Sequence, residues 1–350
     1  MRQRFKNLWS IVCVFLAVTL TVTAGYAAEY EGIAANTAAV LKEKVQSPSV
    51  SSVGGEWTII ALGGNHMLTD EYAMIYYNNL CKVAAQKEGV LHSRKYTEYA
   101  RAVLALGAIG QNPENVAGYN LLLPLRDFDS VIRQGINGAV YALLALNNYP
   151  GGENLQMCEK YKEYILSKQN RDGGFSLGGA SETDITAMAV QALAVAGGCE
   201  EAVEKALAFL AEVQSENGGF EMYGEETLES CAQVIIAMCA AKIDINDPRF
   251  VKNGLSPLDN LLGFYNGEGF GHIKSDLKTN IMATEQALCA LAALKRFENG
   301  EGFLYNYKKE DFSQINRIEG INRNVILQLA KCVESKQAKK VLQAVLEKTA

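Results

Sequence analysis

Two kinds of helical pattern alternate along this chain of 350 residues. Some segments, such as 186–196, are rich in Ala and Leu and are apolar almost all the way round, which is typical of buried helices. Others, such as 200–214, carry an apolar stripe that includes Val203, Leu207 and Leu210, opposite a charged face. No stretch shows sustained period-two alternation, so little β-structure is expected. The alternation predicts an all-α protein with one layer of helices inside another.

A glycine turn recurs between the two kinds of segment. The sequence Gln-x-x-Asp-Gly-Gly-Phe occupies 169–175, a copy occupies 214–220, and a looser Gly-Glu-Gly-Phe turn occupies 267–270. Glycine tolerates the positive φ angles of a tight reversal. Thr183 or Asp184 is placed to cap the helix that follows the first turn.

The number of repeats predicts how the layers close. Six apolar segments recur about every 40 to 50 residues, and they end near Leu62, Leu106, Leu146, Leu193, Met238 and Leu291. Amphipathic segments occur at 70–86, 121–133, 155–169, 200–214, 256–264, 320–334 and 337–348, and the last two can close a ring. Six inner helices alternating with outer ones predict a double-layered α6/α6 toroid, with an α-solenoid as the alternative.

The N-terminus predicts export from the cytoplasm. Residues 1–28 combine three basic residues, an apolar run from Leu8 to Ala24 and small residues after it, which is the pattern of a secretory signal peptide. An uncleaved anchor is the alternative. With cleavage, we expect a secreted or cell-surface protein that has no membrane span. A short helix and linker at 29–54 would precede a toroid domain at 55–350.

Composition excludes several kinds of partner and site. Without residues 1–28 the chain holds 30 basic and 39 acidic residues and no basic cluster, which argues against nucleic acid and anionic membranes. Seven widely spaced cysteines remain, mostly in Ala/Leu-rich segments, and they are best interpreted as buried small apolar residues. The sequence therefore predicts no metal site, and it leaves the disulfide state and the oligomeric state open.

The repeated turns resemble those of the prenyltransferase and squalene cyclase superfamily, over about residues 55–300. The resemblance implies the same toroid, with a central cavity for an apolar or macrocyclic ligand. Class II terpenoid cyclases of this superfamily carry an Asp-x-Asp-Asp-Thr-Ala motif, whose middle acid protonates an alkene. Residues 182–187 read Glu-Thr-Asp-Ile-Thr-Ala, so the resemblance implies Asp184 as a catalytic general acid, assisted by Glu229 or Glu285.

Two other branches of the superfamily imply different ligands. Protein prenyltransferases hold zinc with an Asp, a Cys and a His, but no Asp-x-Cys motif occurs in this chain. Secreted cobalamin carriers have a helix start similar to residues 184–189, which implies a corrinoid as a possible ligand. Those carriers clamp the corrinoid with a C-terminal β-domain, so we expect either a separate β-domain or another cell-surface protein as a partner, or a different ligand. No cofactor is predicted with certainty.

Polar and aromatic residues recur where the apolar segments begin. If the ring closes, we expect them to line one mouth of its cavity and to bind the ligand; the alternative is that they cap helices. The candidate ligand-binding residues are Trp57, Glu98, Arg101, Gln134, Tyr141, Asp184, Glu229, Gln233, Glu285 and Gln286. The leading hypothesis is a non-catalytic binding module for an apolar or macrocyclic small molecule. The alternatives are a class II terpenoid cyclase and a cell-surface adaptor that binds another protein through its acidic exterior.

Overall fold

The computed structural model describes residues 30–222 and 224–307, which all belong to the first of two compact units in the chain; that unit ends at Tyr307. Its inner helices are α2 (Trp57–Gly64), α4 (Thr97–Ala108), α6 (Ile136–Leu146), α8 (Thr183–Ala196), α10 (Leu228–Ala240) and α12 (Ile281–Glu298). Its outer helices are a helix over residues 30–44, α3 (Asp70–Gln86), α5 (Phe128–Val131), α7 (Gly152–Leu166), α9 (Glu200–Val213) and α11 (Pro257–Leu262). Shorter elements are η1 (Ser52–Glu56), η2 (Leu123–Arg126), η3 (Ile132–Gln134), β1 (Glu221–Met222) and β2 (Glu225–Glu226).

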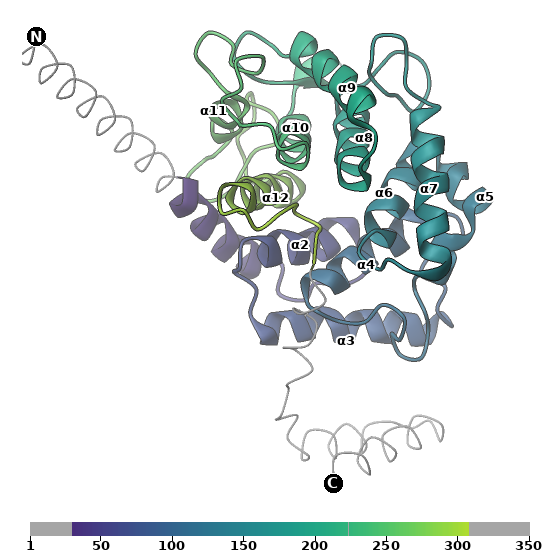
Figure 1. Ribbon diagram of the computed structural model, residues 1–350. Helices are drawn as coiled ribbons and strands as arrows, with labels where there is room; N and C mark the ends of the chain where they lie inside the picture. The colour runs from purple at the N-terminus through teal and green to yellow at the C-terminus, as the bar shows by residue number, and fades with distance from the viewer. Residues whose placement is uncertain (1–29, 223, 308–350) are drawn as a thin grey trace, which may run out of the picture. The chain divides into compact units, whose positions relative to one another are not determined.

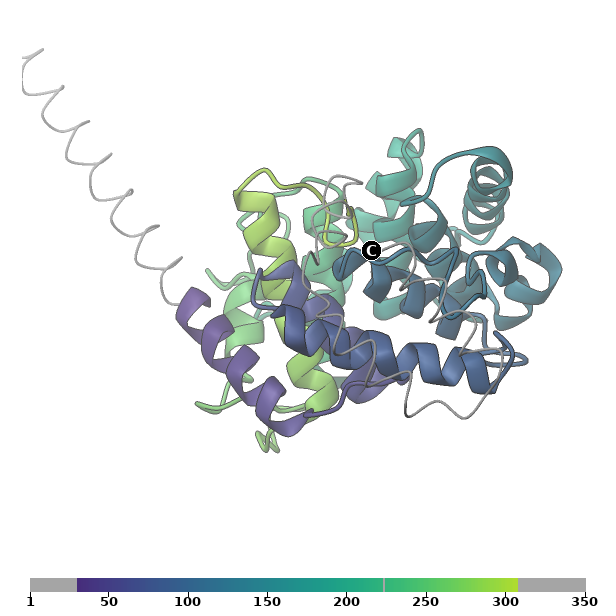
Figure 2. The ribbon, with the colours of Figure 1, turned by 90° about the horizontal axis from the view of Figure 1, so that it is seen from below.

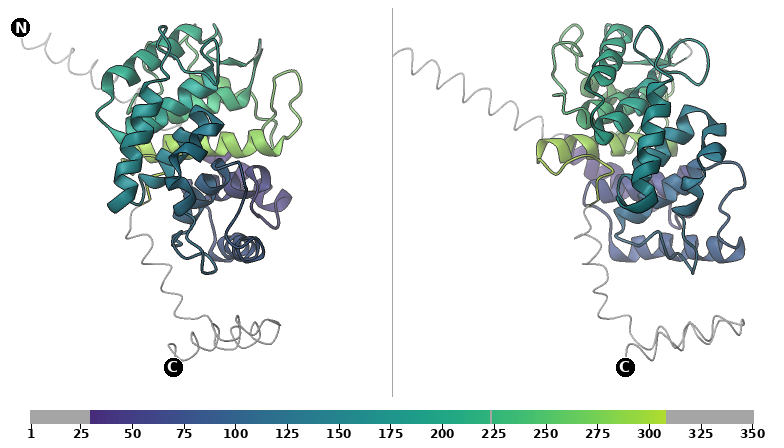
Figure 3. Two further views of the ribbon diagram at one scale, coloured as in Figure 1. Left: turned by 90° about the vertical axis from the view of Figure 1, so that its right-hand side faces the viewer. Right: turned by 45° about the vertical axis from the view of Figure 1, so that its right-hand side comes forward.

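The inner helices form a closed ring (Figure 1). Each one packs against the next in the order α2, α4, α6, α8, α10 and α12, and α12 packs against α2. In the side views, α12 lies between the first elements of the chain and the green elements that precede it (Figure 3). The predicted α6/α6 toroid is therefore confirmed, and an open solenoid is excluded. Among the described residues, no helix is both long and apolar enough to cross a bilayer.

The helix over residues 30–44 occupies an outer position beside α12 and the start of α3 (Figure 2). It buries an apolar stripe of Tyr30, Ala34, Ala38 and Leu41, whose spacing places them on one face. The Tyr30 hydroxyl donates to Glu298 of α12, and Lys42 Nζ donates to the carbonyl oxygen of Met67 at 3.3 Å. The sequence predicts only a short helix within residues 29–54, and the structure shows a helix over residues 30–44. The segments 320–334 and 337–348 lie outside the described residues.

One predicted outer helix is wrong as a continuous element. The segment 121–133 consists of η2, α5 and η3 instead of a single helix. Pro124 lacks the N–H that a continuing helix needs, and the Asp127 side chain accepts a hydrogen bond from Ser130 N, which starts α5 anew. The outer layer is therefore irregular beside α6.

The glutamine that opens each repeated turn ties the turn to the next outer element. Gln169 Nε2 donates to the carbonyl oxygens of Gly173 and Ala202, both at 2.8 Å. Gln214 Nε2 makes the equivalent bonds to Gly218 O at 3.0 Å and Phe250 O at 2.9 Å. The turns themselves need glycine: Gly173 has φ 89°, and a Cβ there would lie 2.4 Å from the Lys205 carbonyl oxygen.

The segment after α12 crosses the carboxyl-terminal ends of α2, α4 and α6. A Cβ on Gly64 would lie 2.7 Å from Leu304, and a Cβ on Gly107 would lie 2.4 Å from the Tyr307 ring. Tyr307 N donates to Asn148 Oδ1 at 3.1 Å. The carboxyl-terminal ends of these three inner helices are thereby covered.

Candidate functional site

Exposure falls along the amino-terminal turns of the inner helices. Val53, just before α2, is 42% exposed, whereas Trp57 one turn further on is 7% exposed. On α12, Met282 is 39% exposed and Gln286 is 6% exposed. Met282 and Gln286 are four residues apart and lie on the same face of α12, so this pair follows one line into the ring. Val53 belongs to a non-helical stretch that leads into α2. Solvent therefore reaches the first turn of these helices and little beyond the second.

Aromatic side chains meet across the interior. Trp57 of α2 and Tyr141 of α6 have ring centroids 5.9 Å apart in an edge-on arrangement, although α2 and α6 are not neighbours in the ring. Tyr305 approaches Trp57 with a centroid distance of 6.4 Å. The Tyr141 hydroxyl donates to Met188 Sδ of α8 at 3.1 Å. These four side chains form an apolar cluster across the inside of the ring, which we call the aromatic floor.

Three buried glutamines, which we call the glutamine chain, connect α8, α10 and α12. Gln191 Nε2 donates to Gln233 Oε1 at 2.8 Å, and Gln233 Nε2 donates to Gln286 Oε1 at 2.8 Å. The three residues are 1%, 7% and 6% exposed in that order. Gln191 was not among the predicted site residues, although a glutamine inside the apolar segment 186–196 was a signal that a buried polar group needs partners there.

Two carboxylates of neighbouring helices stand at the same end of the ring. Asp184 lies in the first turn of α8, and its Oδ1 has no hydrogen-bond partner among the described residues. Burial raises the pKa of the Asp184 carboxyl, and a hydrogen bond from Ser230 opposes that rise. The predicted capping role is wrong for Thr183 and Asp184, because α8 begins at Thr183 and Glu182 is its cap residue.

The second carboxylate, Glu229 of α10, pairs with a histidine. Glu229 Oε2 lies 2.6 Å from His272 Nδ1, while Glu229 Oε1 has no partner in the described part of the chain. The pKa of Glu229 is raised, and burial is the main cause. Hydrogen bonds from its own backbone N–H and from His272 oppose this rise, and the Asp184 charge adds a small further increase. The structure thus places Asp184 and Glu229 on neighbouring inner helices, each with one carboxylate oxygen that has no partner among the described residues.

Arg101 on α4 sits between two glutamates. Its Nη2 lies 2.7 Å from Glu98 Oε2, and its Nε lies 3.6 Å from Glu56 Oε2. Burial raises the pKa of Glu56 to about 8, against the lowering effect of Arg101. Tyr76 of α3 donates to Glu56 Oε1 at 3.4 Å, so Glu56 faces the outer layer, whereas Glu98 remains partly exposed at the rim.

Two of the predicted residues make contacts within the wall of the ring. Gln134 accepts from Thr97 N at 3.1 Å and donates to Thr97 Oγ1 at 3.3 Å, so it caps α4 from outside that helix. Glu285 is fully buried; it accepts from Gly54 N at 3.0 Å and from the Thr58 hydroxyl. These contacts join α4 to η3 and α12 to α2. Ligand contact by either residue stays a prediction.

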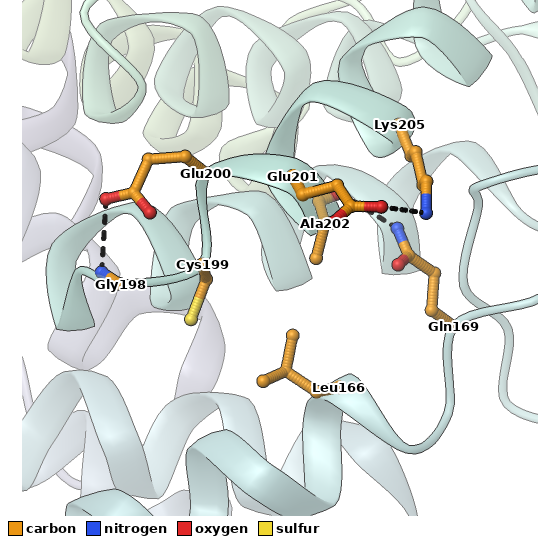
Figure 4. Close-up of a pocket in the computed structure, with 8 residues that line it drawn as sticks. All are labelled: Leu166, Gln169, Gly198, Cys199, Glu200, Glu201, Ala202 and Lys205. Carbon is orange, nitrogen blue, oxygen red and sulfur yellow. Dashed lines mark hydrogen bonds and ion pairs between the residues drawn. The ribbon is translucent and has the colours of Figure 1, made fainter.

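Two hollows lie outside the ring. One of about 360 Å³ lies between the end of α7 and the start of α9, where Leu166 and Cys199 face it (Figure 4). Its polar groups are already paired, as Lys205 is with Glu201 at 2.7 Å. The other, of about 300 Å³, lies between η1, α3 and the start of α4, and Glu98 lines it.

The described cysteines are unpaired. Cys81 is partly buried, whereas Cys158, Cys199, Cys231, Cys239 and Cys289 are buried, as expected for small apolar residues. Burial raises the pKa of each of these thiols, which disfavours the reactive thiolate. Within residues 30–222 and 224–307, no group of three His, Cys, Asp or Glu side chains could hold a metal ion.

Comparison with known proteins supports the fold. Residues 134–264 match the family model described as the prenyltransferase alpha-alpha toroid domain. The chain is similar to the solved structure of ent-copalyl diphosphate synthase from Streptomyces platensis, with a TM-score of 0.50 and 17% identity over 68% of this chain. That similarity spans 49% of the synthase, about half of its length.

A second similar solved structure is described as UGL_D88N/dGlcA-Glc-Rha-Glc. It matches with a TM-score of 0.57 and 15% identity over 79% of this chain and 98% of that one. No curated protein matches the chain. At these identities the likeness shows the fold alone. The predicted resemblance to the prenyltransferase and squalene cyclase superfamily is confirmed at the level of an α/α toroid.

Proposed function

We propose that this protein is a secreted, non-catalytic binding module that holds a small molecule at the amino-terminal end of its inner ring. The observation that carries the proposal is the pair of unsatisfied carboxylate oxygens, Asp184 Oδ1 and Glu229 Oε1, above an aromatic floor. Buried polar groups in folded proteins are almost always hydrogen-bonded. A bound molecule would supply the partners. Export is supported by the leader-like pattern of residues 1–28.

The shape of the site favours a flat or macrocyclic ligand with polar groups at its edge. Trp57, Tyr141 and Met188 offer apolar contact area, whereas Asp184 and Glu229 supply carboxylate oxygens in the first turns of α8 and α10. Ligand sites commonly combine an apolar body with a few placed polar groups. A corrinoid has this character, so it is our specific candidate. A partner protein or separate β-domain would then cover the open side.

Acid catalysis of the terpenoid cyclase type is the second candidate. It is favoured by the raised pKa of Asp184 and by the position of Asp184 in the Glu-Thr-Asp-Ile-Thr-Ala run. A cyclase, however, guides an apolar chain and a carbocation through its cavity. Asp184 Oδ1 and Glu229 Oε1 have no partner among the described residues, and a hydrocarbon ligand would leave both oxygens unpaired. Binding of a polar-edged ligand is therefore the better proposal.

Tryptophan fluorescence tests the proposal directly. The chain has two tryptophans, Trp9 in the leader-like segment and Trp57 in the site, so the protein from residue 29 onward reports from Trp57 alone. Titration with dicyanocobinamide should quench Trp57 and raise the melting temperature. Hemin and squalene test other macrocyclic and isoprenoid ligands. Absence of quenching and of any thermal shift with all three would contradict the proposed ligand class.

An activity assay separates the two candidates. The protein would be incubated with squalene and with geranylgeranyl diphosphate, and the products would be analysed by mass spectrometry. Cyclised product that disappears in Asp184→Asn, while the variant still folds, would establish the cyclase. Binding without turnover in both proteins would support the module.

A further inference from the structure

The glutamine chain has a fixed direction. Gln191 Nε2 donates to the main-chain oxygen of Gln233 at 3.2 Å as well as to its side-chain oxygen at 2.8 Å. A carbonyl oxygen can only accept, so the Gln191 amide cannot be flipped without losing this bond. Gln233 must then accept with its oxygen and donate with its nitrogen, and Gln286 must accept from it. The chain therefore ends in a donor, Gln286 Nε2.

No described residue accepts a hydrogen bond from this terminal donor. Gln286 as a whole is 6% exposed, and its Nε2 is not among the buried side-chain atoms that lack a partner, so solvent reaches this atom. It lies one turn below Met282, which is 39% exposed, so it is directed along the face that opens to solvent. Three amides joined in one direction polarise one another, which strengthens the donor at the end. Helix packing alone requires no such donor, because apolar side chains would fill the same space.

Two unsatisfied acceptors lie on the helices that pack beside this donor. Glu229 precedes Gln233, the partner of Gln286, by one turn on the same face of α10, and α10 packs against α12 and α8. Its Oε1 has no partner among the described residues, and neither has Oδ1 of Asp184 in the first turn of α8. The ring thus presents one free N–H donor and two free carboxylate oxygens at the same end. A group that completes both must itself carry an acceptor and a donor.

We propose that the amino-terminal end of the ring recognises an amide group of its ligand, whose C=O accepts from Gln286 Nε2 and whose N–H donates to Glu229 or Asp184. This inference rests on the proposed binding function and narrows the ligand to neutral molecules that carry a primary or secondary amide. A hydrocarbon satisfies neither half of the pattern. An ester supplies only the acceptor, and an ammonium ion supplies only donors.

Three small probes separate these possibilities: N-methylacetamide, methyl acetate and isopropylammonium. Binding to the protein from residue 29 onward is followed by the indole N–H signal of Trp57 in proton–nitrogen correlation spectra. The expected order is N-methylacetamide well ahead of methyl acetate, with isopropylammonium weak. Equal binding of amide and ester, or a clear preference for the ammonium ion, would overturn the inference.

Variants of Gln286 test the donor itself. Gln286→Glu keeps an oxygen for Gln233 Nε2 but replaces the terminal NH2 by a second carboxylate oxygen with a negative charge, and Gln286→Met removes the whole amide without adding a charge. Both should weaken N-methylacetamide binding by about tenfold, which corresponds to the loss of one good hydrogen bond. Gln169→Met is the matched control, because it makes the same substitution at a glutamine of the outer layer. It should leave binding unchanged. Unchanged binding in folded Gln286→Glu would refute the role of this donor.

The two proposals fail in different ways. If dicyanocobinamide binds and its amide-free heptamethyl ester analogue binds equally well, the module stands and amide recognition is wrong. If the amide probe binds and depends on Gln286 but no corrinoid binds, amide recognition stands and the corrinoid is wrong. If neither probe set perturbs Trp57, both proposals are wrong.

Discussion

Glu285 provides a test of the buried electrostatics that hold α12 to the start of α2. Its side chain is fully buried, its Oε1 accepts from Gly54 N at 3.0 Å and from the Thr58 hydroxyl, and its Oε2 has no partner in the described part of the chain. Burial raises its pKa from 4.5 to about 7, against the lowering effect of these hydrogen bonds. We predict that Glu285→Gln removes a pH dependence from stability.

The sign follows from proton binding. Between pH 4.5 and 7 the folded state keeps a proton on Glu285 that the unfolded state has released, so stability falls as pH rises through this range. Each pKa unit corresponds to about 1.4 kcal/mol, so a shift of this size costs about 2 to 3 kcal/mol of unfolding free energy between pH 5 and pH 8. Glutamine keeps the accepting oxygen and stays neutral. The variant should therefore gain about 2 to 3 kcal/mol over the unmodified protein across this range.

Urea unfolding followed by Trp57 fluorescence and circular dichroism at pH 5 and pH 8 measures this difference. Glu268→Gln removes the same charge from an exposed turn and serves as the control, because its effect should be small at both pH values. A pH-independent difference between Glu285→Gln and the unmodified protein would refute the argument. So would a variant that is less stable at pH 8, since that would mean that Gly54 N and Thr58 stabilise an ionised carboxylate.

Two further predictions concern stability. Gln214→Ala should lower the unfolding free energy by about 2 to 3 kcal/mol, because it removes two hydrogen bonds and leaves the oxygens of Gly218 and Phe250 unpaired; urea unfolding checks this. The partly exposed Gln169→Ala should cost less. Gly107→Ala should cost about 1 to 3 kcal/mol, because its Cβ would lie 2.4 Å from the Tyr307 ring. In a double-mutant cycle, Tyr307→Ser should relieve most of that cost, and strict additivity would contradict the contact.

The architecture was predictable from the sequence because it depends on repetition. The turns at 169–175 and 214–220 repeat both their glycines and the glutamine that anchors them, so two independent copies indicated the same local structure. The apolar segments then fixed the number of inner helices. The irregular stretch at 121–133 was misjudged, because its apolar spacing is helical while Pro124 and Asp127 interrupt the backbone.

The site was only partly predictable, because it depends on how neighbouring helices are placed against one another. Asp184, Glu229, Gln233 and Gln286 were proposed from their positions near helix starts, and the structure brings them to one end of the ring. Gln191 was missed because it lies in the middle of α8, where sequence position gives no reason to expect a partner. Only the register of α8 against α10 places its amide beside Gln233.

The two ends of the inner ring differ in how they are covered. The segment after α12 covers the carboxyl-terminal ends of α2, α4 and α6, and Tyr305 extends that cover up to Trp57. Polar groups inside such a ring would be costly if they served packing alone, because buried donors and acceptors need partners. The unpaired carboxylate oxygens of Asp184 and Glu229 are found in the first turns of α8 and α10, where helix starts supply a favourable field for anionic groups. A ligand that brings matched donors and acceptors to this end would stabilise the ring as well as bind to it, so binding and melting temperature should rise together.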